Sequence, residues 1–498
     1  MTYHEAMNRT LLRGISILAV AMVCLLLPVS AQKVIYSNYE PYDLRSSDMA
    51  IVGKINGTLY TFRSYNNDYL LEAYNEAMEK QATVILDFFP SRIYCVRFVP
   101  FEQQILVLYQ AVDGTRVTQY AAMLDESGRL KKGPLRIDEK RSGFLGSTTD
   151  REYFASVVSE NREHIVVYSP RIKGRQLDFM AYWLDPQQFR VVKRHKLKFK
   201  GGNLLTSGEA LLSNSGQFYL PVYTQIGSRD FSDEYALLGL KKEDIGFKVA
   251  RLNLEDKYLE YPFQRIDNQN AKIHLGSFFS TRKNGNNEGV VAATFDIGSG
   301  EFSSSRFIPF DEQLRAETGR RSNKQRALND FRINQLVIKN DGGFVLAAEE
   351  YFVTTRTNYM PGMGFYSFYY TPMMSQNIRE YHFNDILVLS YDSAGTPEWN
   401  SFIRKEQYSQ EDGGMFSSYT MLNTGGGLGF LFNDFNSNRS RIQLASLDPS
   451  GKLSTGFMDS GSSDDPDWLP RSGKQVAARE IIIPCLHKKQ ICFAKIVL

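Results

Sequence analysis

Histidine titrates near neutral pH and binds transition metals, so its spacing is the first place to look for catalytic or metal chemistry. The six histidines stand singly, and none belongs to a His-Glu-x-x-His pair or a Cys/His metal pattern. His382 alone borders a candidate binding segment, where a packed or capping role is expected. The Gly-x-Ser-x-Gly and phosphate-loop motifs are also absent. The sequence therefore predicts no catalytic residue, no metal, no cofactor and a protein that is not an enzyme.

Aromatic and methionine side chains are concentrated in one segment, residues 354–384, among glycines and prolines. So many apolar side chains cannot all face water cheaply. The segment either folds back on its own scaffold as a plug, the commoner fate, or presents a patch to a protein or glycan partner. On the second interpretation the partner-binding residues are Tyr359, Met363, Phe365, Tyr366, Phe368, Tyr369, Tyr370 and Met373.

Residues 311–330 form a second candidate contact segment. Acidic residues at its start predict a short helix that breaks at Gly319. Arg315, Arg320 and Arg321 could contact an anionic partner. The alternative, a solvated surface excursion, is the usual role of such a charge run.

Two cysteines near the end of the chain could form a disulfide. If Lys488 and Lys489 make the turn of the last hairpin, Cys485 and Cys492 lie opposite each other across the two strands. Opposed positions have Cβ atoms about 5 Å apart, which is close to bonding distance. The alternative is two small buried residues with free thiols. Cys95 would remain free in the core.

The first 31 residues have the features of a secretory signal peptide. Arg9 and Arg13 precede an apolar stretch, and small residues at 29–31 suggest cleavage before Gln32. No later stretch approaches the roughly 20 apolar residues of a membrane-spanning helix. The formal charge of +3 falls by one on cleavage, which gives no argument for nucleic acid. We expect an exported protein, periplasmic or extracellular and possibly envelope-associated, that is a monomer and binds no nucleic acid.

Hairpin-forming segments recur along the whole chain and determine its fold class. Alternating apolar strands end in Asp or Asn before a turn, and Asn-Gly or Asp-Gly pairs join others. The strands that end in this way lie at 71–75, 121–125, 181–185, 249–253, 291–296, 386–392 and 442–448, with a truncated copy at 492–498. Because the Asp residues recur at turn starts, we interpret them as structural. The repeat predicts an all-β protein, a single β-propeller over residues 32–498 with seven or eight four-stranded antiparallel blades. The N-terminal strand Lys33-Val-Ile-Tyr would close the ring.

The long connections are expected on one face of this propeller. In a four-stranded blade with strands a to d, the a–b and c–d turns lie on one face, and the b–c and d–a connections lie on the other. The a–b and c–d turns are nearly all tight. The three large insertions, 226–246, 311–330 and 354–384, fall in b–c and d–a connections, so their face is the candidate binding surface.

The segment Ser390-Tyr-Asp-Ser-Ala-Gly-Thr-Pro-Glu-Trp399 resembles the quinoprotein-like and WD40-like propeller repeats, with Asp, Gly and then Trp after the third strand. It also resembles the Asp-box of sialidases, with one extra residue between Asp and Gly. Longer blocks around residues 329–350 and 399–407 resemble an uncharacterised family of exported bacterial propellers. These resemblances imply a propeller fold and no particular activity.

Two functions remain open at this point. The first is a non-enzymatic binding or scaffold propeller of the bacterial cell envelope. The second is a propeller glycosidase of sialidase type, which needs an arginine cluster and a carboxylate-activated tyrosine near the axis. Arg97, Arg332 and Arg479 are candidates for such a cluster. Their convergence would favour the enzyme.

Overall fold

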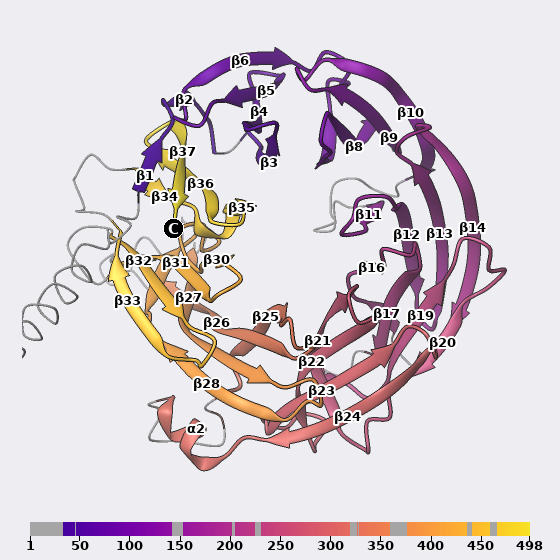
Figure 1. Ribbon diagram of the computed structural model, residues 1–498, viewed down its shortest axis with the longest axis vertical. Helices are drawn as coiled ribbons and strands as arrows, with labels where there is room; N and C mark the ends of the chain where they lie inside the picture. The colour runs from indigo at the N-terminus through magenta and orange to yellow at the C-terminus, as the bar shows by residue number, and fades with distance from the viewer. Residues whose placement is uncertain are drawn as a thin grey trace, which may run out of the picture.

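The computed structural model describes residues 33–44, 46–141, 153–201, 205–224, 231–318, 326, 328–358, 376–435, 441–458 and 466–498. Its strands form eight antiparallel sheets arranged in a ring around a central opening (Figure 1). The fold is thus an eight-bladed β-propeller, which confirms the predicted fold class. The expected signal peptide, residues 1–31, lies outside the described part of the chain. Within that part, no helix has the length and apolar character needed to traverse a lipid bilayer.

Each of the first four blades takes its strands from consecutive segments, in order from the centre outward. Blade 1 contains β3 (Met49–Ile55), β4 (Thr58–Tyr65), β5 (Asp68–Tyr74) and β6 (Lys80–Ile85). Blade 2 contains β7 (Ile93–Pro100), β8 (Gln104–Asp113), β9 (Arg116–Asp125) and β10 (Leu130–Arg141). Blade 3 contains β11 (Ala155–Val158), β12 (Ile165–Lys173), β13 (Gln176–Asp185) and β14 (Arg190–Lys200). Blade 4 has a divided inner strand and contains β15 (Leu205–Ser207), β16 (Leu211–Leu212), β17 (Phe218–Thr224), β19 (Tyr235–Leu240) and β20 (Lys248–Arg251).

The next three blades follow the same order. Blade 5 contains β21 (Tyr258–Asp267), β22 (Lys272–Ser280), β23 (Gly289–Asp296) and β24 (Glu301–Pro309), with the short β18 (Phe231–Ser232) beside β21. Blade 6 contains β25 (Phe331–Ile338), β26 (Phe344–Asn358), β27 (Gln376–Tyr391) and β28 (Pro397–Ile403). Blade 7 contains β30 (Thr420–Asn423), β31 (Leu428–Asp434), β32 (Arg441–Leu447) and β33 (Leu453–Phe457).

Blade 8 joins the two ends of the chain. Its inner edge is formed by β34 (Asp467–Trp468) and β35 (Lys474–Ala477), which both pair with β36 (Glu480–His487). The third strand is β37 (Gln490–Val497), and the N-terminal strand β1 (Lys33–Tyr36) pairs with it as the outer strand, as predicted. This closure removes the free sheet edges that would otherwise invite aggregation.

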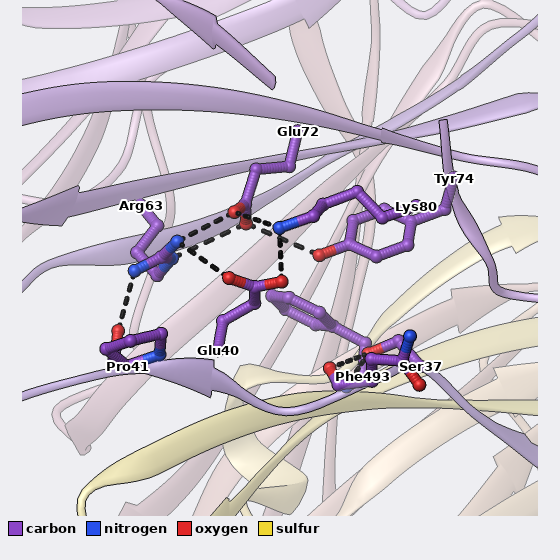
Figure 2. A network of polar contacts seen from close by, with 9 residues as sticks. Ser37, Glu40, Pro41, Arg63, Glu72, Tyr74, Lys80 and Phe493 are labelled. Atoms are coloured by element: carbon purple, nitrogen blue, oxygen red, sulfur yellow. Dashed lines mark hydrogen bonds and ion pairs between the residues drawn. The ribbon is translucent and has the colours of Figure 1, made fainter. Parts of the chain in front are cut away.

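A buried ion network holds the N-terminal segment against blade 1 (Figure 2). The Glu72 side chain on β5 is fully buried, binds Arg63 Nη2 at 2.7 Å and lies 3.7 Å from Lys80 Nζ. Glu40, on the short strand β2 (Glu40–Pro41), pairs with both cations. Arg63 also donates to the Pro41 carbonyl oxygen at 2.6 Å. Because β2 follows the strand that completes blade 8, the network fastens the first blade to the last.

Side chains of neighbouring blades form the apolar core. One cluster joins Phe62 and Leu71 of blade 1 to Val107 of blade 2, and another joins Phe179 of blade 3 to Phe218 of blade 4. Each blade therefore packs on its neighbours, as in other repeat architectures whose core grows by addition of units.

Blade 4 departs from the sequence-based prediction. The pattern places its third strand at 249–253 and an insertion at 226–246, and both assignments are wrong. The third strand is β19, which lies inside the expected insertion and pairs with β17, while β20 is the outer strand. All six residues of β19 are buried, so this strand lacks the alternation that marks a half-exposed one. Asn253 starts a d–a connection, where its Oδ1 accepts from the Glu255 amide at 3.1 Å.

The cysteines are opposed as predicted but are not bonded. Cys485 and Cys492 face each other across β36 and β37, and both are buried free thiols. The expected disulfide is therefore absent from the structure. Burial, followed by the adjacent Cys492, raises the pKa of the Cys485 thiol. That disfavours the thiolate which oxidation requires. Cys95 is half-buried on β7, so the expectation that it lies in the core is wrong.

The turn aspartates have the structural role that the repeat indicates. Asp392 Oδ1 accepts from the amides of Ala394 at 2.9 Å and Thr396 at 2.7 Å. Asp448 Oδ1 accepts in the same way from Ser450 at 2.9 Å and from Lys452 at 3.0 Å. Such bonds stabilise the ionised carboxylate.

These bonds predict a loss of stability in acid. The Thr396 amide foremost holds the pKa of Asp392 below its ordinary value of 3.8, and the Ser450 hydroxyl foremost does the same for Asp448. The stabilisation is therefore present above the ordinary value and is lost as the pH falls through the lowered one. Asp392→Asn combined with Asp448→Asn keeps the hydrogen-bond acceptors without the charge. Calorimetry should show a shallower fall in Tm between about pH 5 and pH 3 for this variant than for the unaltered chain. Equal slopes would contradict the assignment.

Candidate functional site

The elaborations of this propeller gather on one face. We call the face made by b–c and d–a connections the loop face, and the opposite one the turn face. In the described residues, every helix and every strand outside the blades proper lies in a loop-face connection. These elements are β2, β18, α2 (Glu312–Glu317), β29 (Gln407–Gln410) and η3 (Pro470–Ser472). The described ends of the segments 311–330 and 354–384 lie in a d–a and a b–c connection, respectively.

The largest elaboration is a β-ribbon, which corrects the expectation of an irregular loop at 354–384. The inner strand β25 begins at Phe331, opposite Glu350 of β26. Beyond this pair, β26 and β27 remain paired with each other as far as Asn358↔Gln376. β29 adds a third strand along residues 380–383 of β27. We call residues 351–358 and 376–383 the hairpin arm. Eight strand residues extend about 27 Å. The β-branched and aromatic residues at its base favour this pairing.

The predicted contact residues Tyr359, Met363, Phe365, Tyr366, Phe368, Tyr369, Tyr370 and Met373 all lie outside the described residues. Whether they form a plug or a patch therefore stays a prediction. The described base of the arm shows only that the strands leading to them leave the blade on the loop face.

One face of the arm carries an aromatic row across three strands. Phe352 and His382 are a directly opposed pair and stack with ring centroids 4.5 Å apart. Tyr408 of β29 is opposed to His382, at 5.2 Å between centroids, and is 46% exposed. Tyr408 Oη donates to Glu380 Oε1 at 2.8 Å. His382 is thus a packed histidine, as expected. The sequence analysis missed Phe352 and Tyr408, although the alternation of β26 marks Phe352 and Thr354 as one face.

A buried lysine fixes the arm where it leaves blade 6. A register shift there leaves two residues of β27 opposite Glu350. Lys405 Nζ donates to the carbonyl oxygen of Phe383 and to Gln407 Oε1, both at 2.9 Å, and pairs with Glu349 Oε1 at 2.8 Å. Glu349 Oε2 accepts from the Ser418 hydroxyl at 2.6 Å. Burial foremost lowers the pKa of Lys405, and the Glu349 charge opposes this.

The helix α2 lies on the rim of the same face. Asp311 caps it by accepting from the Leu314 amide at 2.7 Å, and the helix ends at Glu317 before Gly319, as the sequence predicts. Arg315 donates to the carbonyl oxygens of Asn287 and Glu288 at 3.4 and 3.2 Å, and its guanidinium lies 5.6 Å from the Phe310 ring. This placement favours a role in anchoring the helix. Arg320 and Arg321 lie outside the described residues.

The described residues bring no histidine-based or metal-binding site together. The five described histidines are distributed over four blades: His164 and His195 in blade 3, His274 in blade 5, His382 in blade 6 and His487 in blade 8. No group of three or more His, Cys, Asp or Glu in the described part of the chain could hold a metal ion.

The arginines considered for a sialidase-type site lie in three different blades. Arg97 lies in blade 2, Arg332 in blade 6, and Arg479 in the turn before β36 of blade 8. Arg332 stacks on the Tyr261 ring at 4.6 Å and donates to its hydroxyl at 3.0 Å. This is one Arg–Tyr pair between the inner strands of blades 5 and 6.

Comparisons with known proteins give only distant likenesses. No protein-family model and no characterised protein matches the sequence. Among solved structures, the chain is similar to Sqt1 of Chaetomium thermophilum, with a TM-score of 0.42, 11% identity, and 93% and 97% of the two chains covered. The chain is also similar to prolyl oligopeptidase B of Galerina marginata, bound to a macrocyclization substrate, with a TM-score of 0.42 and 11% identity. The match covers 92% of this chain and 56% of the oligopeptidase. The similarity to the polysaccharide lyase Uly1 has a TM-score of 0.39 and 8% identity, and it covers 80% of this chain and 89% of the lyase. The chain therefore spans little more than half the length of the oligopeptidase, and these likenesses say nothing about activity.

Proposed function

We propose that this chain is an exported, non-enzymatic binding propeller of the bacterial cell envelope that holds a protein or glycan partner on its loop face. One observation carries the proposal: in the described residues, every element added to the blades projects from that face. The turn face, by contrast, is closed by short Asx turns. Rigid scaffolds with elaborated loops on one side commonly use those loops for binding.

The aromatic row of Phe352, His382 and Tyr408 supplies the chemistry for such contact. Flat rings suit the apolar faces of sugars and the side chains of peptides. Tyr408 combines an exposed ring with a hydroxyl held by Glu380, so its orientation is set before a partner arrives. Such pre-organisation lowers the entropy cost of binding.

Export supports the same assignment. The basic and apolar character of residues 1–31 is typical of a signal peptide. The intact mass of the secreted protein should correspond to a chain that begins at Gln32. A mass that includes residues 1–31 would contradict export by cleavage.

The register of the arm allows a clean truncation. Residues 357–377 can be replaced by Asn-Gly, because Arg356 and Ile378 are a directly opposed pair that a two-residue turn can join. The shortened chain should recover about tenfold less partner from an envelope extract than the full chain, because the partner contacts the arm. Quantitative mass spectrometry of the bound fraction measures this loss.

A matched pair of point variants separates contact from general stickiness. Tyr408→Ser removes an exposed ring from β29, which pairs with the arm, whereas Phe457→Ser removes one of similar exposure from the outer strand β33. Only the first should reduce recovery. Equal recovery by the full and shortened chains, or equal losses in the two point variants, would overturn the proposal.

A further inference from the structure

Three cations from three blades line the wall of the central opening. Arg97 lies on the inner strand β7, Arg162 in the turn between β11 and β12, and Lys474 on the inner strand β35. Each binds a backbone carbonyl of a neighbouring blade: Arg97 that of Ser156, Arg162 that of Pro100, and Lys474 those of Ile51 and Val52, at 3.1 and 3.0 Å.

The surroundings of these cations are unusual for this molecule. Other lysines at the inner strands are paired with carboxylates. Lys54 on β3 pairs with Glu480, and Lys339 directly after β25 pairs with Glu398, both at 2.5 Å. In the described residues neither Arg162 nor Lys474 forms an ion pair. Arg162 uses only Nη1 for its contact, which leaves further guanidinium donors for a ligand.

The three cations surround a cavity of about 400 Å³. Its lining contains one carboxylate, Glu160, whose Oε2 accepts from Asn268 Nδ2 at 2.9 Å. The ionisable side chains of the cavity are therefore Arg97, Arg162, Lys474 and Glu160, with an excess of positive charge. A second cavity of about 390 Å³ shares Arg97 and is lined by polar groups that include Ser156 and Gln119, together with the carboxylate of Glu209. Cavities of this size accept small molecules.

We propose that this cavity is a binding site for a small oxyanion, a ligand carrying carboxylate, sulfate or phosphate groups, held by Arg97, Arg162 and Lys474. Planar guanidinium groups donate in pairs to such oxygens, and the ammonium adds a point charge. The site lies inside the ring and does not depend on the hairpin arm, so it goes beyond the proposed function.

The electrostatics of Lys474 agree with this geometry. Burial foremost, and then the charges of Arg162 and Arg97, lowers the pKa of its ammonium. Three cations held together disfavour the protonated form, and a bound anion would relieve their repulsion. The lysine should therefore lose its proton at a lower pH than an ordinary lysine does. A ligand that needs the charged lysine should dissociate at that lower pH as the pH rises.

Isothermal titration calorimetry with sulfate, phosphate and malonate, against chloride at equal ionic strength, tests the site. The whole chain should bind one equivalent of at least one of these anions. Lys474→Met and Arg162→Met should each raise the dissociation constant about tenfold or more. Lys198→Met, which removes the same charge from an exposed position on the outer strand β14, should leave it unchanged.

The outcomes separate clearly. Binding of sulfate or phosphate alone assigns a tetrahedral oxyanion, and binding of malonate alone assigns a carboxylate ligand. Arg162→Lys keeps the positive charge but loses the paired guanidinium donors, so this variant should bind the anion more tightly than Arg162→Met does. It also controls for the possibility that the methionine variant fails to fold. No saturable binding above chloride, or equal losses in Lys474→Met and Lys198→Met, would overturn the proposal.

Discussion

Replacing Glu72 with alanine should lower the free energy of unfolding by about 3–5 kcal/mol. The Glu72 carboxylate is fully buried and lies between Arg63 and Lys80, with its Oε2 accepting from Tyr74 Oη at 3.3 Å. Removing it leaves the 4%-exposed Arg63 side chain without its main counter-charge. Because the same guanidinium holds the carbonyl of Pro41, the loss should also loosen the segment that closes the ring. Urea unfolding followed by circular dichroism measures the change.

Two controls make this result interpretable. Glu102→Ala removes an exposed carboxylate and should change stability by less than about 0.5 kcal/mol. The double variant Arg63→Met with Glu72→Leu removes both buried charges, so it should recover much of the lost stability. A Glu72→Ala variant within about 1 kcal/mol of the unaltered chain would show that the network does not fasten the ring.

The second large effect is expected at the base of the hairpin arm. Lys405→Met should also cost about 3–5 kcal/mol, since it leaves the Glu349 carboxylate buried without a counter-charge. It also removes the donor that satisfies the Phe383 carbonyl oxygen at the register shift, so the arm should become less firmly held. Urea unfolding gives the first quantity, and amide hydrogen exchange of residues 378–383 gives the second.

Lys452→Met is the matched control for this variant, because Lys452 is exposed. It should change the free energy of unfolding, and the opening free energy obtained from amide exchange of residues 378–383, by no more than about 0.5 kcal/mol each. If Lys405→Met loses stability while exchange in the arm stays as slow as before, the lysine stabilises the blade without positioning the arm.

Much of the fold could be predicted from the sequence because its signals are local. Asn-Gly and Asp-x-x-Gly turns specify hairpins by their backbone conformation, and Asn56 and Gly57 have the positive φ angles, 48° and 81°, that such a turn needs. The closing strand could be found because Lys33-Val-Ile-Tyr is an isolated strand pattern beside an incomplete last blade. The prediction of the strands of blade 4 was wrong for two reasons. β19 is buried on both faces and so lacks alternation, and Asn253 has the sequence pattern of a turn that follows a third strand.

The candidate sites were less predictable because their residues meet only through the fold. Glu349 lies on β26 and Lys405 in the connection after β28, and nothing in either local sequence marks them as a buried pair. Arg162 and Lys474 lie more than 300 positions apart in the sequence and come together only because blades 3 and 8 face one opening. By contrast, the assignment of 311–330 and 354–384 to one face follows from counting strands, and the described ends of both segments lie in d–a and b–c connections.

Hydrogen–deuterium exchange of the chain bound to its recovered partner tests the central claim most directly. The account predicts slower exchange on the loop face, at residues 351–355, 378–383 and 407–410, and unchanged exchange in the turn-face segments 126–129, 393–396 and 449–452. Protection confined to the turn face or to the outer strands would contradict it.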